Sequence, residues 1–451
     1  MLSKIISAAT LGVKAYPVEV EADIQQQLPL FVTVGLPDGA VRESKERVTA
    51  AIKNSDFVFP AKKVTINLAP ADIKKEGSAF DLPIAVGILA ATGQILRDRC
   101  DEFVMVGELS LDGAVRSVHG VLPMTMNFRQ CNGIRGIIVP KENAKEAAIA
   151  GTIPVYPVGS LKEAVHFLED ESAIKPFRMD VNSVFLQAHK YNIDFVDVKG
   201  QESAKRALEV AAAGGHNIVM IGPPGTGKTM LARRMPTILP DMSVEEALET
   251  TKIHSVAGRL PANSALVATR PFRSPHHTIS YAGLIGGGTI PKPGEVSLAH
   301  HGVLFLDELP EFKKDILEML RQPMEDNQVT ISRAATTLTY PASFMLIAAM
   351  NPCPCGYFGD PMHDCNCSTS EIQRYMSRIS GPLMDRIDIH ITVPSVKFKE
   401  LSSDACGEKS ETIRQRVNQA RHRQLKRFMN ERHIFCNAHM ESRDIRKYCS
   451  I

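Results

Sequence analysis

The sequence Gly222-Pro223-Pro224-Gly225-Thr226-Gly227-Lys228-Thr229 decides the fold of the central part of this chain. It follows the short apolar stretch 217–221 and precedes a helical segment, Met230 to Met235. This order of strand, glycine-rich loop and helix is typical of a P-loop, whose glycines let backbone N–H groups point toward phosphate oxygens. In such a loop the lysine reaches the β- and γ-phosphates and the hydroxyl binds magnesium. We therefore predict that residues 222–230 bind ATP, with Lys228 in a catalytic role and Thr229 as a Mg²⁺ ligand.

A second motif fits the first. The apolar stretch 303–306 is followed directly by Asp307 and Glu308, so a strand delivers two acids at its carboxyl end. Ligands bind at that edge of open α/β sheets. We predict that Asp307 holds the magnesium through water and that Glu308 is the general base that polarises the attacking water.

Two further residues are candidates for the same site. Asn351 ends the apolar stretch 344–350, where its amide could orient the water between Glu308 and the γ-phosphate, although an asparagine before Pro352 is also a common turn residue. Arg386 precedes another strand and could act as an arginine finger on a neighbouring subunit. The sequence equally allows a local ion pair of Arg386 with Asp385 or Asp388.

The chain as a whole is predicted to be α/β. Its 451 residues divide into an α/β domain at 1–168, a charged linker at 169–190, a core with a doubly wound parallel sheet at 191–400, and a basic helical segment at 401–451. The predicted core strands are 217–221, 303–306, 344–350 and 387–393. In the first domain, 18–23 alternates as a half-exposed strand does, 30–34 and 64–68 are further strands, and Ser78 with Asp81 predicts a capping box before a buried helix.

Composition limits the setting. The formal net charge is only +2, so no global charge demands a nucleic-acid partner, and a basic helix such as the one after Glu411 is more often a solvated lid face than a DNA site. No apolar run is long enough to span a membrane, and the amino terminus does not resemble a secretory signal. The nine cysteines follow no disulfide spacing. These features favour a cytoplasmic protein.

Four of the cysteines form two close pairs. Cys353 and Cys355 are separated by nine residues from Cys365 and Cys367. Four thiolates at this spacing are able to hold one structural Zn²⁺, with His363 as a spare donor. The alternatives are a loop of reduced cysteines and a redox-labile cluster. A metal here would brace the loop between Asn351 and a helix that begins, with a predicted capping box, at Ser368 and Glu371.

In this order, the motifs resemble those of the AAA+ ATPases, in their magnesium-chelatase-like branch and most closely the ComM/YifB family. The resemblance covers nearly the whole chain, and it is carried by the segments 34–41, 67–72, 274–278, 306–308, 350–352 and 380–386. It implies a ring, as a hexamer, with ATP sites between subunits and Arg386 as a finger acting in trans. It further implies that the insert with His276, His277, Tyr281, Gly286-Gly287-Gly288 and Lys292 forms a hairpin facing the pore, with a second hairpin around 331–333.

The same resemblance implies a function. Members of this family are associated with ATP-driven unwinding and branch migration of recombination intermediates in natural transformation, so single-stranded or branched DNA is the expected partner. Basic and aromatic residues in a glycine-rich insert suit such a role, since they track phosphates and stack on bases. Taken alone, His276 and His277 are more often loop residues with local hydrogen bonds.

The first domain resembles the fold shared by the Lon protease domain and ribosomal protein S5. Lon requires a serine nucleophile and a lysine, but the matching positions here are Ala79 and Leu122, so we expect no protease activity. The resemblance also implies that a sensor-2 arginine lies in a lid segment beyond Ile451.

Other functions remain open from sequence. The alternative that we retain is an ATP-dependent protein-remodelling chaperone of the same branch, because pore loops grip polypeptide and DNA with similar residues. A metal-insertion partner of magnesium chelatase is disfavoured by the Lon-like domain, and an ATP-dependent protease by the missing serine and lysine.

Overall fold

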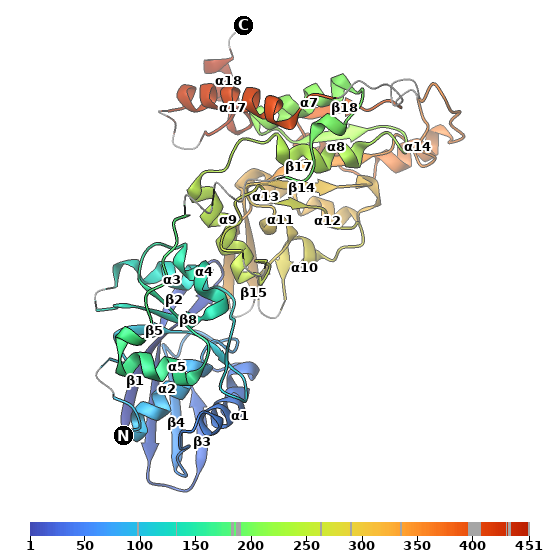
Figure 1. Cartoon of the computed structure of the whole chain (residues 1–451). Coiled ribbons are helices and arrows are strands. Elements are labelled where there is room, and N and C mark those ends of the chain that lie inside the picture. Colours follow the sequence, from blue (N-terminus) through green and yellow to red (C-terminus); the bar gives the residue numbers. More distant parts are fainter. Residues whose placement is uncertain are drawn as a thin grey trace. The chain divides into compact units, whose positions relative to one another are not determined.

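The computed structural model of the chain describes a set of ranges that together cover most of the sequence. They are 1–96, 99–131, 133–181, 185, 191–261, 264–288, 291–333, 336–395, 407–429, 431 and 434–449. Two compact units divide the chain (Figure 1). Unit 1 comprises Met1–Gln187 and Thr251–Val267, and unit 2 comprises Ala188–Thr250 and Ala268–Ile451. The predicted division into four segments stays a prediction. The sequence did not predict that residues 251–267, which follow the P-loop in the chain, group with the first unit.

Unit 1 is built on a seven-stranded mixed sheet in the order β3-β4-β2-β1-β5-β8-β9. Its strands are β1 (Leu2–Leu11), β2 (Lys14–Gln25), β3 (Leu30–Val34), β4 (Lys63–Ala69), β5 (Phe103–Met105), β8 (Gly136–Pro140) and β9 (Val155–Val158). The predicted alternation is confirmed in β2, where Val18, Val20 and Ala22 are fully buried between less buried neighbours. Side chains of a strand alternate between its two faces, so this register buries one face of β2.

The helices of unit 1 complete its core. They are α1 (Gly39–Asn54), α2 (Asp81–Thr92), α3 (Val121–Asn127), α4 (Ala144–Ala148) and α5 (Leu161–Glu169). The predicted buried helix is confirmed in α2, whose first eleven residues are all buried. The predicted capping box of Ser78 with Asp81 is wrong, because α2 begins after Phe80 without a side-chain cap. The Ser78 hydroxyl instead donates to the Glu108 carboxylate.

One helix belongs to both units. Helix α9 (Val244–Val256) begins in unit 2 and ends in unit 1, where the chain continues to Val267. In unit 1 the Ser255 hydroxyl donates to Glu146, a buried carboxylate on α4 that also accepts the backbone N–H of Leu122. The backbone N–H of Val267 donates to the Thr251 hydroxyl at 3.0 Å. Residues 251–267 are therefore fastened to the same helices that pack on the unit 1 sheet.

Unit 2 contains a five-stranded parallel sheet in the order β11-β14-β17-β10-β18. Its strands are β11 (Phe272–Arg273), β14 (Val303–Leu306), β17 (Met345–Met350), β10 (Ile218–Ile221) and β18 (Ile389–Thr392). All of the residues in β14 and β17 are buried. This agrees with the prediction from their near-continuous apolar sequences, which are typical of a sheet covered on both faces. The α/β fold class with a parallel core sheet is thus confirmed.

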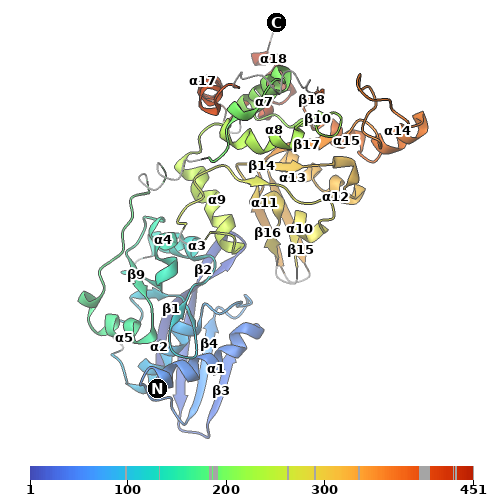
Figure 2. The same ribbon diagram turned by 45° about the vertical axis from the view of Figure 1, so that its right-hand side comes forward.

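Helices and two hairpins surround this sheet (Figure 2). The helices are α7 (Glu202–Gly214), α8 (Lys228–Arg234), α10 (Tyr281–Leu284), α11 (Glu295–Leu298), α12 (Lys314–Glu318), α13 (Arg321–Asp326), α14 (Thr369–Met376), α15 (Gly381–Met384), α17 (Ser410–Arg427) and α18 (Ser442–Tyr448). The capping box of Ser368 and Glu371 is confirmed at the start of α14. Both predicted hairpins also form, β12 (Gly286–Gly287) with β13 (Lys292–Pro293) and β15 (Gln328–Arg333) with β16 (Thr336–Pro341).

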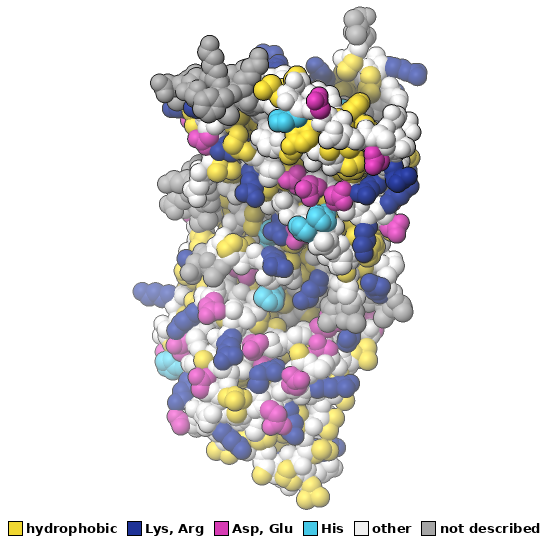
Figure 3. Space-filling view, turned by 90° about the vertical axis from the view of Figure 1, so that its right-hand side faces the viewer, with side chains coloured by type: hydrophobic (Ala, Val, Ile, Leu, Met, Phe, Trp, Pro, Cys, Tyr) yellow, Lys and Arg dark blue, Asp and Glu magenta, His cyan; other side chains and the backbone are white. Residues whose placement is uncertain are grey.

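The surface carries charges of both signs. On the face drawn in Figure 3, basic and acidic side chains are interspersed, in keeping with the small net charge of the chain. No described helix combines the length and the apolar composition that crossing a lipid bilayer requires.

Candidate nucleotide-binding site

The predicted P-loop connects β10 to α8 at the carboxyl edge of the parallel sheet. Gly225 and Gly227 adopt φ values of +77° and +81°, a region that side chains with a Cβ rarely enter. At Gly222 the constraint is space, because a Cβ there would lie 2.2 Å from the Val393 carbonyl oxygen. The glycines therefore permit a backbone path that other residues would disrupt, and the path places α8 with its amino terminus at the loop.

Lys228 begins α8 and is 8% exposed. Its Nζ donates to the carbonyl oxygens of Gly222 at 2.7 Å and Pro223 at 2.8 Å, and to Asn351 Oδ1 at 3.2 Å. Burial lowers the pKa of the lysine, and nearby Asp307 opposes that effect. A buried ammonium whose acceptors are mostly neutral gains from an anionic phosphate, so this geometry fits the predicted contact with nucleotide.

Thr229 and Asp307 lie together as the magnesium prediction requires. The Thr229 hydroxyl donates to Asp307 Oδ2 at 2.7 Å, and Asp307 Oδ1 accepts the backbone N–H of Glu308 at 3.0 Å. Mg²⁺ binds oxygen ligands, commonly one or two protein groups together with phosphate oxygens and water. A hydroxyl and a carboxylate in contact at the end of the P-loop fit that ion.

Glu308 follows β14 with φ of +52°, a strained conformation for a residue with a Cβ. Its side chain is 59% exposed, and Oε2 lies 3.6 Å from Nδ1 of His277. The sequence singled out His277 only as part of the insert, and this contact was missed. The strand order could have indicated this contact. Strands β11 and β14 are parallel neighbours, so the segments that follow them begin at the same edge of the sheet.

Asn351 lies at the carboxyl end of β17, beside the P-loop strand. Its side chain contacts Lys228, and the neighbouring backbone N–H of Gly222 donates to the Met350 carbonyl at 3.2 Å. Burial raises the pKa of Tyr375, which lies near Asn351, Glu311 and Glu308, to about 12. The structure therefore brings Asn351 to the predicted phosphate-binding lysine, and its role in orienting water stays a prediction.

Arg386 lies apart from these groups. Its Nη2 pairs with Glu325 Oε1 at 2.5 Å, and 49% of the side chain is exposed. The alternative of a local pair with Asp385 or Asp388 is not the pair that forms, because Arg386 pairs with Glu325 and Asp388 pairs with His216 at 2.9 Å. Among the described residues, no ion pair or hydrogen bond joins Arg386 to the P-loop of its own chain, so its role in trans stays a prediction.

The four predicted cysteines come together. Ligand atoms of Cys353, Cys355, Cys365 and Cys367 all lie within 4.8 Å of one another. The Cys353–Cys365 and Cys355–Cys365 sulfur distances are 3.7 and 3.6 Å. Tetrahedral zinc with Zn–S bonds of about 2.3 Å separates its sulfurs by about 3.8 Å, so this geometry fits zinc. His363 bonds Asp360 at 3.0 Å instead of joining the four thiols.

The cysteine loop packs on the P-loop. A Cβ on Gly356, one residue after Cys355, would lie 2.8 Å from Cδ of Pro224. Cys353 itself is fully buried and follows Asn351 by two residues. The loop thus contacts the phosphate-binding backbone on one side and continues into the capping box of α14 on the other.

A second group with metal-ligand chemistry consists of Glu249, His300 and His301. Nδ1 of His300 accepts the backbone N–H of Ser343 at 3.0 Å, so the proton of the neutral ring is on Nε2. That nitrogen faces Glu249 Oε2 at 3.5 Å, and hydrogen bonds from His300 and His301 hold the pKa of Glu249 below its usual range. A protonated nitrogen does not ligate metal, and the carboxylate of Glu249 is instead bonded by His301 Nε2 at 3.0 Å.

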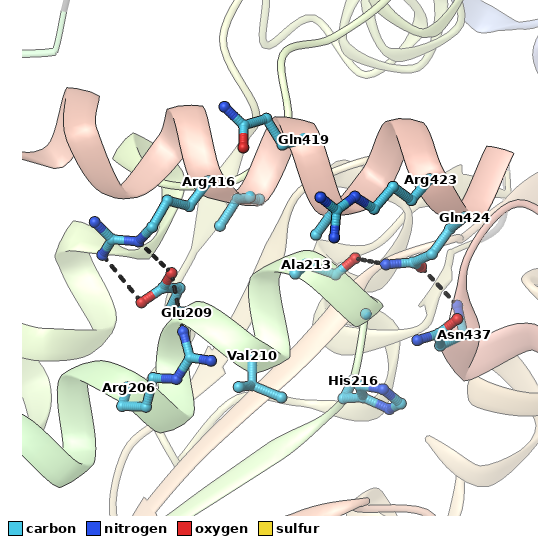
Figure 4. Close-up of a pocket in the computed structure, with 13 residues that line it drawn as sticks. Arg206, Glu209, Val210, Ala213, His216, Arg416, Gln419, Arg423, Gln424 and Asn437 are labelled. Atoms are coloured by element: carbon cyan, nitrogen blue, oxygen red, sulfur yellow. Dashed lines mark hydrogen bonds and ion pairs between the residues drawn. The ribbon is translucent and has the colours of Figure 1, made fainter. Parts of the chain in front are cut away.

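A separate groove lies between α7 and α17, with a volume of about 390 Å³ (Figure 4). Its acid, Glu209, lies between Arg206 at 3.1 Å and Arg416 at 2.7 Å. Arg416 also pairs with Glu408. The charge of Arg416 on α17 is therefore neutralised within the chain by two acids.

The nucleotide-binding geometry and the parallel sheet define the class as a P-loop ATPase of the AAA+ type. Comparison with known proteins agrees. Residues 194–401 match the family described as magnesium chelatase, subunit ChlI, residues 20–143 match subunit ChlI of Mg-chelatase, and residues 407–451 match its C-terminal part.

Relatives extend the match to the whole chain. The uncharacterized protein YifB of Escherichia coli is 45% identical over 452 residues, which is 100% of this chain and 86% of that protein. Competence protein ComM of Haemophilus influenzae is 42% identical over 453 residues, 100% of this chain and 87% of the relative. Lon protease 2 of Bacillus subtilis is 32% identical over 150 residues, 31% of this chain and 26% of that protein. The chain belongs to the ComM/YifB family of magnesium-chelatase-like proteins.

Proposed function

We propose that this protein is an ATP-hydrolysing ring motor, a hexamer that acts on single-stranded or branched DNA as a helicase or in branch migration during natural transformation. The observation that carries the ATPase part is the contact of Lys228 with Asn351 and of Thr229 with Asp307 at one edge of the sheet. The similarity to ComM, a competence protein, supports the DNA part.

Each group has a distinct task in the proposed hydrolysis. Backbone N–H groups of residues 222–227 and Lys228 bind the phosphates, and Met230 follows in the helix that they begin. Magnesium, held by Thr229 and Asp307, would neutralise phosphate charge. Glu308 accepts the proton of the attacking water, which Asn351 orients. Arg386 of one subunit stabilises the transition state in the next subunit's site.

The two hairpins are the proposed contact with DNA. Tyr340 of β16 donates to the Pro291 carbonyl at 2.6 Å, directly before β13. A Cβ on Gly287 would lie 3.2 Å from Nη2 of Arg333. The hairpins therefore support one another, and they present exposed basic side chains at Lys292 and Arg333. Cations on hairpins of this kind suit a phosphate backbone.

We further propose that the four cysteines hold a structural Zn²⁺. Four protein ligands leave no open coordination position, so the metal would brace Asn351 and the P-loop without taking part in hydrolysis.

The test of the proposed function is ATP turnover, measured alone, with single-stranded DNA, with forked DNA and with an unfolded protein. DNA should stimulate turnover, and Glu308→Gln should abolish it in every condition, since the general base is removed. Turnover that responds to unfolded protein and not to DNA would favour the chaperone alternative. Turnover indifferent to both additions contradicts a DNA motor and leaves the ATPase assignment intact.

A further inference from the structure

The groove between α7 and α17 is separate from the nucleotide-binding site (Figure 4). Its described lining comes from one face of each helix, together with His216 and Asn437, which follow these helices in the chain. His216 comes before β10, at the amino edge of the parallel sheet, whereas the P-loop follows β10 at the carboxyl edge. With a volume of about 390 Å³, the groove has the size of small-molecule sites.

One end of the groove gathers hydrogen-bond donors that have no acceptor. Arg423 is exposed, and no ion pair or hydrogen bond joins it to another described residue. Oδ1 of Asn437 is buried without a partner, and its amide N–H2 group likewise has no acceptor among the described residues. Gln424 accepts the backbone N–H of Asn437 and donates to the Ala213 carbonyl, both at 2.9 Å, so contacts to both helices fix this end. Figure 4 shows His216 at the same end.

The lining also carries an excess of positive charge. Its described residues include three arginines and one acid, Glu209. Glu209 is bound by Arg416 at 2.7 and 3.1 Å and by Arg206 at 3.1 Å, and Glu408 neutralises Arg416 from outside the lining. Arg423 lies about two turns further along α17, beyond these acids. A guanidinium with free N–H groups in a groove is suited to bind an oxyanion.

The floor between the two ends is apolar. Val210 of α7 is 43% exposed, and Ala213, Val417 and Ala420 line the groove beside it. Covering this surface removes apolar area from water, so an organic body gains there. A phosphate monoester suits the charged end better than a carboxylate does, because it offers three acceptor oxygens and about 1.5 to 2 negative charges at neutral pH. The groove therefore fits a small organic phosphate.

We propose that the groove between α7 and α17 binds a phosphate monoester of the size of a nucleotide, with its phosphate on Arg423 and Asn437 and its organic body over Val210. Such a ligand joins α17 to the helix that leads into the P-loop strand, and it leaves the ATP site free. The site does not depend on the polymer that the protein moves.

The test is the binding of adenosine monophosphate to the full chain with Lys228→Ala, which removes phosphate binding at the P-loop. Ligand-observed NMR should show saturable binding, and Arg423→Gln should raise the Kd by about tenfold or more, since a charge-assisted contact is lost. Val210→Glu, on the other helix, should also weaken binding, because it places a negative charge on the exposed floor. Arg427→Gln, at an exposed arginine of α17 outside the lining, is the matched control and should leave the Kd unchanged.

Two further ligands separate the parts of the recognition. Adenosine lacks the phosphate and inorganic phosphate lacks the organic body, so both should bind more weakly than adenosine monophosphate. Absence of binding up to about 10 mM, or equal affinity of the Arg423→Gln and Arg427→Gln proteins, overturns the proposal. Adenosine that binds as tightly as the monophosphate contradicts recognition through the phosphate, and inorganic phosphate that does so contradicts a role for the floor. Circular dichroism of each variant establishes that a lost affinity does not result from misfolding.

Discussion

At the level of single residues, burial and specific partners have opposite effects on the pKa of an ionisable side chain. Asp81 at the start of α2 is fully buried, and Arg47 of α1 binds both of its carboxylate oxygens, at 2.6 and 3.0 Å. Burial raises the pKa of Asp81 to about 6 even though Arg47 and the backbone N–H of Leu109 favour the charged form. Desolvation outweighs pairing here because the carboxylate has almost no contact with water.

The raised pKa predicts a pH effect on stability. The folded state holds a proton on Asp81 at pH values where the unfolded state has lost it, so raising the pH through about 6 weakens folding. Between pH 5 and 7 the loss should be about 1 kcal/mol. Asp81→Asn does not titrate, so the unfolding free energy of the wild type relative to this variant should fall over that interval. Urea unfolding of both proteins at pH 5 and pH 7 measures this difference in unfolding free energy. A difference that is the same at both pH values would show that Asp81 does not titrate in this interval.

At the scale of elements, the nucleotide site depends on loops that lie far apart in sequence. The cysteine loop reaches Pro224 through Gly356 and begins two residues after Asn351. Of its four cysteines, Cys353 is buried and the other three are partly exposed. A metal that binds only the folded loop stabilises it by mass action.

Loss of the cysteine cluster should therefore weaken nucleotide binding. Cys365→Ser with Cys367→Ser should reduce bound zinc, measured by elemental analysis, from one equivalent to about a tenth or less. KM for ATP should rise more than kcat falls, because the loop supports the P-loop and performs no chemistry. Cys131→Ser, at an exposed cysteine of unit 1, is the control. A wild-type protein without metal, or a double variant with unchanged KM, contradicts this role.

At the scale of the whole molecule, the question is which nucleotide site Arg386 serves. Within its own chain, Arg386 pairs with Glu325 and not with the residues of the P-loop. Arg386 is half exposed and paired with Glu325, a partner that an incoming phosphate could replace. In a ring, an exposed arginine on one subunit is available to the next subunit's nucleotide.

Mixing two inactive variants tests this arrangement. Lys228→Ala and Arg386→Ala should each reduce kcat by about a thousandfold. In mixed rings, some interfaces combine an intact Lys228 from one subunit with an intact Arg386 from its neighbour, so the mixture should recover measurable turnover. Activity equal to the mean of the separate variants would place the arginine in cis or outside the site. Size-exclusion chromatography of each variant confirms that both still assemble.

Sequence reasoning predicted local features well and distant partners poorly. Strands such as β3 and β14 were predicted to the residue because apolar runs bounded by turns or acids reveal their ends. The P-loop, its acids and the cysteine cluster carry fixed spacings. The Ser78 capping box failed because Glu108, thirty residues away, takes the hydroxyl. The Glu325 partner of Arg386 and the His277 contact of Glu308 arise from strand order and packing, which spacing along the chain does not encode.

Helix α9 has a consequence for how the protein is made. Unit 1 includes residues 251–267, which hold the buried Glu146 through Ser255, yet these residues follow the P-loop in the chain. A ribosome synthesises about 5 to 20 residues per second, and domains generally fold as units as they emerge. The first unit therefore cannot reach its final structure when its own 187 residues have emerged, and must await the first strand and helix of the ATPase core. The order of synthesis thus links maturation of the amino-terminal unit to translation of the nucleotide site.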